Sequence, residues 1–573
     1  MRIPPAFSFA FIAILAVPLA AQFEVYRNLD APPIIFPPGD YGRAVCGVGD
    51  LDQDGFPDYA VGTPTAVLNQ GQVRAFSGKT NAQLWSTTGG DFNASFGFDL
   101  AAIGDVNSDG VPDVIVGDPL NDVGPGSDAG RVVVLSGADG SFIFELFGDQ
   151  AGARFGWSVA SAGDATNDGV DDLLVGAPRY DGVGVNSGQV RLYNGSTQGF
   201  AFSFSSGSSF DQLGYDVAGN FDFDGDGYSE IAMGAPFADP NGSQSGEVRI
   251  LTFIQVFGFI TIGEIATLEG VSIGDRFGWS LASFEDLTGD GIGDLAVGSP
   301  NEQNGLASLA GHVRLFAGPN VSAVMDIVGG PSDRLGYSVA NAGDIDGDGV
   351  VDIVVGAINA SMTAADEGAV RVFSGSDGLL IASRFGDPAG GDYGTSVAGV
   401  GDLDGDGVQE IIVGDLANQN VQVLNLPLAY TGSLEDIRME TGIDAEPLSQ
   451  WPDRKHAPAG SLVTFRLRSP EGSYDGMIPV TVGQLFPTLS PPLSPGGFPE
   501  IHVRPSQAFI IYDGNDAPVL GPAVLTALGL TSSFIVPVGL GGTSLMIQGL
   551  SLSPSAQQMN NFFTATNGQE IVF

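Results

Sequence analysis

Seven short acidic loops hold the side chains of this sequence that are best suited to chemistry. Each loop reads Asp-x-[Asp/Asn/Thr]-x-Asp-Gly-x-x-[Asp/Glu], so oxygen-bearing side chains stand at positions one, three, five and nine. Alternate side chains of a curled loop can point toward one centre, and the glycine at position six permits the sharp turn because it tolerates positive φ. Loop by loop, the candidate metal ligands are Asp50, Asp52, Asp54 and Asp58; Asp105, Asn107, Asp109 and Asp113; Asp164, Thr166, Asp168 and Asp172; Asp222, Asp224, Asp226 and Glu230; Asp286, Thr288, Asp290 and Asp294; Asp344, Asp346, Asp348 and Asp352; and Asp402, Asp404, Asp406 and Glu410.

Calcium is the ion that this ligand set favours. It is a hard cation that takes about 6–8 oxygens in a flexible shell, and a backbone carbonyl near position seven can complete the set. Magnesium demands a stiffer octahedron, and zinc would use His or Cys, which these loops lack. We therefore predict up to seven structural Ca²⁺ ions, one per loop, with the weakest sites in the third and fifth loops, where Thr166 and Thr288 each replace a carboxylate.

Two other interpretations of the acidic loops compete with the calcium site. An Asp-Gly pair can simply form the turn of a hairpin; seven copies with constant spacing favour the metal. An EF-hand begins with a similar loop, but it needs flanking helices and a Glu at position twelve. Position twelve is occupied here by residues such as Val61, Val116 and Val413, and both flanks resemble strands.

The loops lie inside a repeat that occurs seven times. Nine residues before each first Asp stands a pair made of an aromatic residue or Leu followed by Gly, and twelve residues after that Asp stands another Gly. Length varies only beyond the second Gly. A repeat of about 58 residues with four short strands has the size of a propeller blade, so we predict an all-β fold with a seven-bladed β-propeller. The opening pairs begin at Tyr41, Phe96, Phe155, Leu213, Phe277, Leu335 and Tyr393.

A regular polar position recurs in the third strand of five repeats, where apolar and polar residues alternate with period two. Sheet alternation favours a solvated strand face at this position, and a ring of basic contacts to a ligand is the alternative. The residues are Arg74, Arg191, Arg249, Arg314 and Arg371.

The repeats resemble the FG-GAP repeats of integrin alpha-chain propellers, through the Phe-Gly openers, the Asp loops and the Gly-Ala-Pro ends at 176–178 and 234–236. The resemblance covers roughly residues 23–426. It implies a seven-bladed propeller with calcium on one face and ligand-binding loops on the opposite face, although those loops match no motif that names a ligand. Residues 23–30 resemble the integrin start and are expected to supply the outer strand of blade seven.

The two ends of the chain differ from the repeats. Residues 1–21 have the Arg2-bearing start, short apolar run and small residues of a cleavable signal peptide, with an uncleaved anchor as the weaker alternative. Residues 22–427 form the predicted propeller. Residues 428–573 are predicted to form a small C-terminal β-sandwich-like domain, similar to C-terminal β modules of secreted bacterial proteins. Cys46, the only cysteine, precludes an internal disulfide and is expected to be a small strand residue.

Charge and motifs restrict the function. A net charge of −46 disfavours nucleic acids and anionic membrane surfaces as partners. No H-E-x-x-H motif occurs, and the three histidines are expected to be structural or on the surface. We therefore expect no catalytic activity, and predict a secreted or cell-surface module for recognition or adhesion that binds an extracellular protein or glycan. The alternative is an extracellular enzyme resembling polysaccharide lyases or phospholipases, or its accessory binding subunit.

Overall fold

The computed structural model describes residues 21–30 and 40–426, apart from 257–258, 306–308, 320, 362–365 and 387–391, and the backbone of several strands in 427–573. The chain divides into two compact units, Met1–Leu426 and Pro427–Phe573. The predicted signal peptide lies almost entirely outside the described residues. Among the described residues, no helix has the length and hydrophobicity needed to cross a bilayer.

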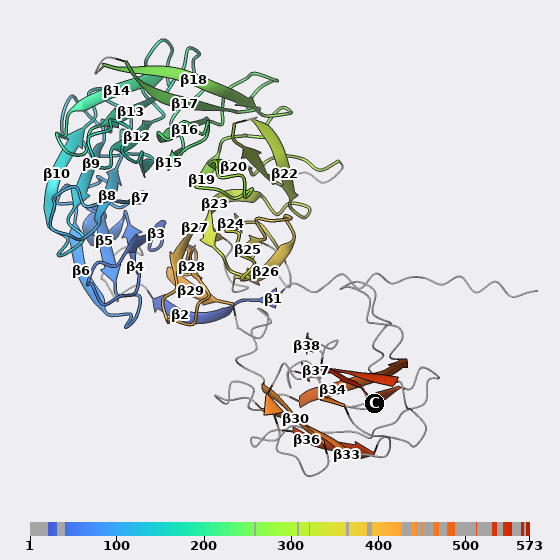
Figure 1. The fold of residues 1–573 in the computed structure, drawn as a ribbon. Coiled ribbons are helices and arrows are strands. Elements are labelled where there is room, and N and C mark those ends of the chain that lie inside the picture. The colour runs from blue at the N-terminus through green and yellow to red at the C-terminus, as the bar shows by residue number, and fades with distance from the viewer. Residues whose placement is uncertain are drawn as a thin grey trace, which may run out of the picture. The chain divides into compact units, whose positions relative to one another are not determined.

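The first unit consists of seven antiparallel sheets of four principal strands each, arranged in a ring (Figure 1). The predicted seven-bladed propeller is thereby confirmed. The first four sheets are blade one with β3 (Ala44–Gly49), β4 (Asp58–Thr63), β5 (Gln72–Phe76) and β6 (Gln83–Thr88); blade two with β7 (Leu100–Ile103), β8 (Asp113–Asp118), β9 (Arg131–Leu135) and β10 (Phe142–Phe147); blade three with β11 (Val159–Ser161), β12 (Leu173–Ala177), β13 (Gln189–Tyr193) and β14 (Phe200–Ser205); and blade four with β15 (Val217–Phe221), β16 (Glu230–Ala235), β17 (Glu247–Val256) and β18 (Phe259–Glu269).

The remaining three sheets close the ring, because the innermost strand of blade seven contacts that of blade one. A short helix, α1 (Ala66–Asn69), follows β4. Blade five has β19 (Ser280–Phe284), β20 (Asp294–Ser299), β21 (His312–Ala317) and β22 (Ser322–Val328); blade six has β23 (Leu335–Gly343), β24 (Asp352–Ala357), β25 (Ala369–Phe373) and β26 (Leu380–Phe385), with β1 (Ala21–Gln22) parallel to β26; and blade seven has β27 (Tyr393–Gly401), β28 (Glu410–Asp415), β29 (Asn420–Asn425) and β2 (Glu24–Asp30).

The N-terminal segment completes blade seven, as the sequence predicts. Strand β2 pairs antiparallel with β29 and forms the outer edge of that sheet, with Leu29 opposite Val421. At the inner edge, the Ser396 hydroxyl donates a hydrogen bond to the Gly42 carbonyl oxygen at 2.7 Å, which joins the last blade to the first. Residues from the two ends of the propeller sequence therefore close the ring.

The repeated glycines are explained by the packing of adjacent blades. The glycine in the second strand of each blade faces the carbonyl oxygen of the opener glycine in the next blade, and a Cβ at Gly62 would lie 2.2 Å from Gly97 O. Blade seven repeats this contact onto blade one, where a Cβ at Gly414 would lie 2.2 Å from Gly42 O. No other residue fits at such distances, so constant glycine spacing marks the seams between the sheets.

The hydrophobic core lies between neighbouring blades. One buried cluster joins blades one and two through side chains that include Trp85 and Leu135. The Trp85 indole also donates a hydrogen bond to Gly137 O at 2.7 Å across the same seam. Cys46 lies half-buried on β3, where burial raises the pKa of its thiol to about 12 and so keeps it protonated.

In the second unit, the structure describes two sheets of backbone. The interpretation of this region as a separate sandwich-like domain stays a prediction, and its side chains, including those of His456 and His502, lie outside the described residues. One sheet contains β31 (Ser449–Gln450), β30 (Arg438–Ile443), β33 (Leu462–Arg468) and β36 (Leu530–Ile535); the other contains β32 (Lys455–His456), β39 (Gln569–Val572), β37 (Thr543–Leu552), β34 (Ile478–Pro487), β35 (Ile511–Tyr512) and β38 (Phe563–Ala565).

Candidate metal centre

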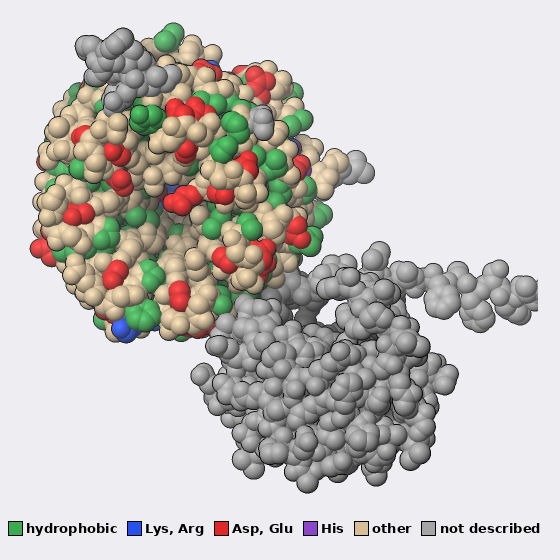
Figure 2. Space-filling model, viewed as in Figure 1, with side chains coloured by type: hydrophobic (Ala, Val, Ile, Leu, Met, Phe, Trp, Pro, Cys, Tyr) green, Lys and Arg blue, Asp and Glu red, His purple; other side chains and the backbone are tan. Residues whose placement is uncertain are grey.

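Each acidic loop connects the innermost strand of a blade to the second strand. The residue at position nine begins the second strand or, for Asp172, immediately precedes it. All seven position-nine carboxylates are buried. Because the innermost strands of all seven blades run in the same direction along the axis of the ring, all seven loops lie at the same end of the propeller. Figure 2 shows that acidic side chains are spread over the visible face and basic ones are scarce, in keeping with the net charge of −46.

Backbone hydrogen bonds hold the loop carboxylates in place. In blade one, the Asp50 carboxylate accepts bonds from the N–H groups of Asp54 (3.0 Å) and Gly55 (2.9 Å), and Asp52 Oδ1 accepts from Asp54 N at 3.1 Å. Gly55 adopts a φ of 89°, which the turn requires. The loop thus curls around its own carboxylates, as the spacing predicts.

The buried carboxylate at position nine ties the loop to the blade. Asp58 Oδ2 accepts a hydrogen bond from Leu51 N at 2.7 Å, and the equivalent oxygens of Glu230 and Glu410 accept bonds of 2.6 Å from Phe223 N and Leu403 N. The carboxylate at position nine therefore fixes the base of the loop to the backbone.

Three acidic groups converge in four of the seven loops. In each group, one carboxylate oxygen per residue lies within 4.8 Å of the others, a separation that one cation can bridge. These are the four loops with four acidic residues at the predicted ligand positions. The groups are Asp50, Asp52 and Asp58 in blade one; Asp222, Asp224 and Glu230 in blade four; Asp344, Asp346 and Asp348 in blade six; and Asp402, Asp404 and Glu410 in blade seven.

The other three loops have a neutral side chain at position three. In blade two the Asn107 amide donates a hydrogen bond to Asp109 Oδ2 at 2.9 Å, and in blade three the Thr166 hydroxyl donates to Asp172 Oδ1 at 3.2 Å. Blade five has Thr288 at this position. A neutral residue here leaves three carboxylates in the loop instead of four, in blade two as well as in blades three and five, and the weaker sites expected in blades three and five stay a prediction. The ligand sets of all seven loops stay predictions.

Burial raises the pKa of the position-nine carboxyls. The pKa rises to about 7 for Glu230 and Asp352 and to about 8 for Glu410, in each case mainly because burial penalises the charged form, with the neighbouring carboxylates adding to the effect. A bound cation would reverse this penalty, since positive charge favours the ionised form.

A divalent cation fits the donor set. The ligand atoms are carboxylate oxygens, which calcium and magnesium prefer and which suit zinc poorly. In blade seven, Glu410 Oε1 is buried beside Asp402 and Asp404 and accepts no hydrogen bond from a described residue. A buried carboxylate oxygen is costly without a partner, and an ion in this loop would supply one.

The structure corrects the prediction for the recurring arginines. Their side chains do not form a solvated strand face: Arg74 and Arg191 are buried, at 7% and 8% exposure. Arg191 Nη2 lies 2.5 Å from Asp149 Oδ1 and Arg371 Nη2 2.7 Å from Asp333 Oδ2, whereas Arg74 donates a hydrogen bond to Gln72 Oε1 at 2.5 Å. Apolar and polar residues alternate along the third strand as expected, but the polar face of the strand is covered by the loop that joins neighbouring blades. These arginines are therefore structural.

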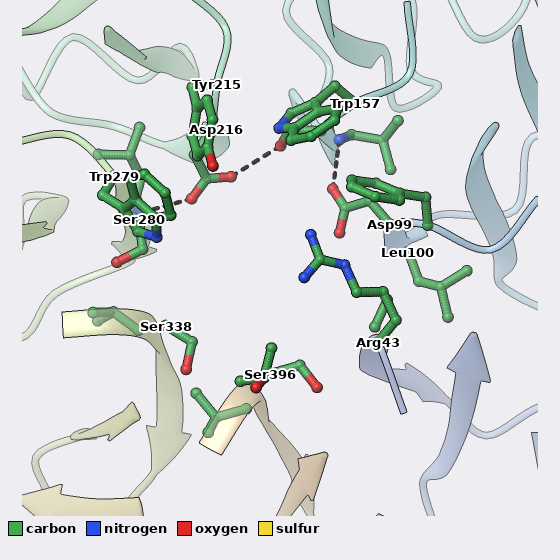
Figure 3. A pocket seen from close by; sticks show the side chains of 18 of the residues that line it. Arg43, Asp99, Leu100, Trp157, Tyr215, Asp216, Trp279, Ser280, Ser338 and Ser396 are labelled. Carbon is green, nitrogen blue, oxygen red and sulfur yellow. Dashed lines mark hydrogen bonds between the residues drawn. The ribbon is translucent and has the colours of Figure 1, made fainter. Parts of the chain in front are cut away.

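A second candidate site, which the sequence analysis did not identify, lies at the opposite end of the ring. A pocket of about 300 Å³ is formed where the innermost strands begin, with side chains from all seven blades (Figure 3). Its residues directly follow each opener glycine, so an alignment of the seven repeats at that position could have revealed them. In chain order these residues are Arg43, Phe98, Trp157, Tyr215, Trp279, Tyr337 and Thr395.

Comparisons with known proteins agree with the repeat pattern. The FG-GAP repeat family matches residues 155–193, 213–251, 277–309 and 335–373, which belong to blades three to six. The chain is similar to integrin alpha-V of Gallus gallus (33% identity over 202 residues, 33% of this chain and 19% of the relative). It is also similar to integrin alpha-4 of Xenopus laevis (36% identity over 168 residues, 27% of this chain and 16% of the relative).

The chain spans about a fifth of the length of these relatives. Among solved structures, the crystal structure of Chaetomium thermophilum Raptor matches 71% of this chain and 30% of that chain, with 10% sequence identity and a TM-score of 0.42. The chain carries FG-GAP repeats and shares distant homology with integrin alpha chains, which confirms the resemblance inferred from the openers and acidic loops.

Proposed function

We propose that this chain is an extracellular recognition module, without catalytic activity, in which calcium ions brace one end of the propeller and the opposite end binds a protein or glycan. The observation that carries the proposal is the convergence of three carboxylates in each of four loops, with ligand oxygens within 4.8 Å of one another. Such groups repel one another without a cation, so an ion stabilises the folded form.

The calcium ligands would come from the four convergent groups first and from all seven loops at high calcium. When bound, calcium supplies positive charge that offsets carboxylate repulsion, and it links the innermost strand to the second strand of each blade. The chain contributes side-chain oxygens at positions one, three, five and nine, which are all carboxylates in blades one, four, six and seven. Extracellular calcium modules bind with dissociation constants of about 10⁻⁴–10⁻³ M, and we expect these sites in that range.

The recognition role is supported by what the other end of the ring exposes. Loops that follow the second and fourth strands reach that end and carry large apolar side chains, including Val183 (79% exposed) and Ile273 (69% exposed). Exposed apolar groups on loops around a pocket are typical of binding surfaces. The predicted signal peptide and the integrin homology support an extracellular location.

Thermal unfolding with calcium or a chelator tests the calcium brace. We expect 10 mM Ca²⁺ to raise the midpoint relative to EDTA, because each site with a dissociation constant of about 1 mM adds about 1.4 kcal/mol to the free energy of unfolding at that concentration. Magnesium at the same concentration is the matched control and should raise the midpoint less. An unchanged unfolding midpoint in calcium would refute the proposal that calcium stabilises the propeller.

A screen for partners and activity tests the recognition role. The full chain in calcium would be assayed for turnover on polysaccharides and phospholipids and for binding to immobilised glycans and extracellular matrix proteins. We expect binding without turnover. Turnover abolished by a substitution in the pocket would replace this proposal with an enzyme.

A further inference from the structure

We propose that the pocket at the start of the innermost strands binds a neutral saccharide unit, such as the end of a glycan chain. This inference rests on the proposed recognition function and names its ligand class. The pocket is built from matching positions of seven blades and has a volume of about 300 Å³, which suits one or two sugar rings (Figure 3).

A continuous arc of aromatic rings forms one side of this pocket. Phe98 and Trp157 have ring centroids 4.6 Å apart, Trp157 and Tyr215 5.7 Å, Tyr215 and Trp279 4.6 Å, and Trp279 and Tyr337 5.5 Å. All five rings are only partly buried. Half-exposed Trp and Tyr rings present an apolar face beside polar tips, and the C–H face of a pyranose can pack against such a ring.

Two carboxylates supply acceptors beside the aromatic arc. Asp99 Oδ2 accepts a hydrogen bond from Val159 N at 2.8 Å, and Asp216 accepts bonds from the Ser158 hydroxyl (2.9 Å) and Leu281 N (2.8 Å). Their backbone and hydroxyl donors come from neighbouring blades, so the carboxylates are fixed before a ligand arrives. A carboxylate oxygen can accept more than one hydrogen bond, and a sugar hydroxyl is a suitable further donor.

Arg43 supplies the complementary donor. Its guanidinium carbon lies 4.5 Å from the centre of the Phe98 ring, and the side chain reaches into the pocket toward Asp99 (Figure 3). A guanidinium stacked on an aromatic ring keeps N–H groups in its plane free for hydroxyl oxygens. Aromatic faces, fixed acceptors and a planar donor together match a ligand that is apolar on its faces and hydroxylated at its edge.

The same residues argue against a charged ligand. Arg43 lies over the Phe98 ring, and the guanidinium carbons of Arg154 and Arg276 lie 5.3 Å from the ring centres of Trp157 and Trp279, so an incoming ammonium or guanidinium group would meet like charges. An anionic sugar would face Asp99 and Asp216 in a chain of net charge −46.

The experiment is a titration of the full chain, in calcium at neutral pH, with glucose, galactose, mannose, N-acetylglucosamine and their β-1,4-linked disaccharides. Saturation-transfer NMR identifies a bound sugar and calorimetry gives its affinity. We expect at least one neutral sugar to bind, and Trp157→Ala to weaken it about tenfold or more, as loss of a central aromatic contact does at binding sites. Asp216→Asn, which keeps the side-chain shape, should weaken the same sugar.

Phe210→Ala is the matched control, because Phe210 is an aromatic residue on a loop at the same end of the ring and is 58% exposed outside the pocket. The Phe210→Ala variant should bind the sugar with the same affinity as the unmodified chain. Trp157→Leu, which fills part of the space without a ring, replaces Trp157→Ala if the latter does not fold. The assignment is overturned if no sugar in the panel binds, if Trp157 variants bind as well as the control, or if tetramethylammonium or arginine methyl ester binds in place of sugars.

Calcium-dependent unfolding of the same samples separates this inference from the proposed function. Stabilisation by calcium without sugar binding would overturn the saccharide assignment and leave the calcium-braced module intact. Sugar binding without stabilisation by calcium would contradict the proposal that calcium stabilises the propeller, and it would support the saccharide assignment of the pocket.

Discussion

Asp58 Oδ1 accepts a hydrogen bond from the backbone N–H of Gly78 at 2.8 Å, and this bond joins the acidic loop of blade one to the hairpin between its third and fourth strands. Gly78 has no alternative at this position, because a Cβ there would lie 1.8 Å from Pro57 O. The equivalent bonds run from Gly137 N to Asp113 (3.1 Å) and from Gly375 N to Asp352 (3.1 Å).

Whether position nine is Asp or Glu depends on which residue this hairpin has at the place of Gly78. Five blades have Asp together with the hairpin glycine, whereas blades four and seven have Glu230 and Glu410. In those two blades the buried apolar residues Phe253 and Leu426 stand where the glycine would be. A larger residue cannot approach the loop so closely. Glu230 and Glu410 keep the bond to the loop backbone through Oε2, and Glu410 Oε1 accepts no hydrogen bond from a described residue.

Gly78→Ala should therefore destabilise the propeller by about 1–3 kcal/mol, as overpacking of a tight contact does. The free energy of unfolding, from urea titration followed by fluorescence, measures the effect. Gly207→Ala is the control, because a Cβ at Gly207 would meet nothing within 4 Å. Equal losses in the two variants would show that the close approach of Gly78 does not matter.

The constant spacing within each repeat made the blades of this fold predictable. Features that depend on contacts between repeats could not be predicted from the sequence. The opener pairs and loops locate the blades because each blade repeats the same short-range constraints, and residues 23–30 were correctly placed at the edge of blade seven. The burial of Arg191 could not be predicted, since the loop that covers it comes from another part of the chain. The pocket residues, such as Trp157 and Asp216, meet only when seven blades close into a ring.

A buried ion pair in blade two provides the second prediction. Arg131 Nη2 lies 2.7 Å from Asp118 Oδ2, and the Asp118 side chain is fully buried. Replacing Arg131 by Met would leave a buried carboxylate without its cation, so we expect a loss of about 3–5 kcal/mol in urea unfolding. Lys79→Met is the control, because Lys79 is exposed and 3.8 Å from Asp54, and it should change stability by less than about 1 kcal/mol in EDTA.

The pocket carboxylate Asp216 predicts a dependence of stability on pH. Its pKa in the folded chain is about 7, raised from 3.8 mainly by burial and also by Asp99, so the folded state holds a proton that the unfolded state releases. This contribution to stability is complete below pH 4 and is lost as the pH rises to about 7, with a slope of at most about 1.4 kcal/mol per pH unit.

Asp216→Asn should flatten this dependence. Because Asn is neutral at every pH, the variant should be about as stable as the unmodified chain at pH 4, where Asp216 is protonated, and should become the more stable of the two as the pH approaches 7. Thermal unfolding from pH 4 to 8 in constant calcium measures both slopes. A parallel pair of curves would contradict the raised pKa of Asp216.

In blade five, a single substitution should strengthen calcium binding. Thr288 is neutral at position three, and Thr288→Asp would give this loop the acidic residues found in the four convergent loops. We expect the variant to bind calcium more tightly in that loop and to show a larger rise in unfolding midpoint with calcium, but a lower midpoint in EDTA because a fourth carboxylate adds repulsion. Ser283→Asp would add the same charge outside the loop and should lower the midpoint without a larger calcium effect. If both variants respond to calcium alike, position three does not supply a ligand.

Closure of the ring by the N-terminal strand gives the last prediction. Leu29 on β2 is 7% exposed and belongs to a buried cluster that includes Tyr59 of blade one and Val423 of blade seven. Leu29→Asp would remove that apolar contact and bury a carboxylate at the seam between the first and last blades, so we expect a loss of about 3 kcal/mol or more in urea unfolding. Asn28→Asp adds the same charge to the exposed side of the same strand and should leave stability almost unchanged. Because β2 joins distant parts of the sequence, the Leu29 variant should also make blades one and seven exchange their amide hydrogens faster than blade four, and uniform exchange across the ring would show that β2 does not close it.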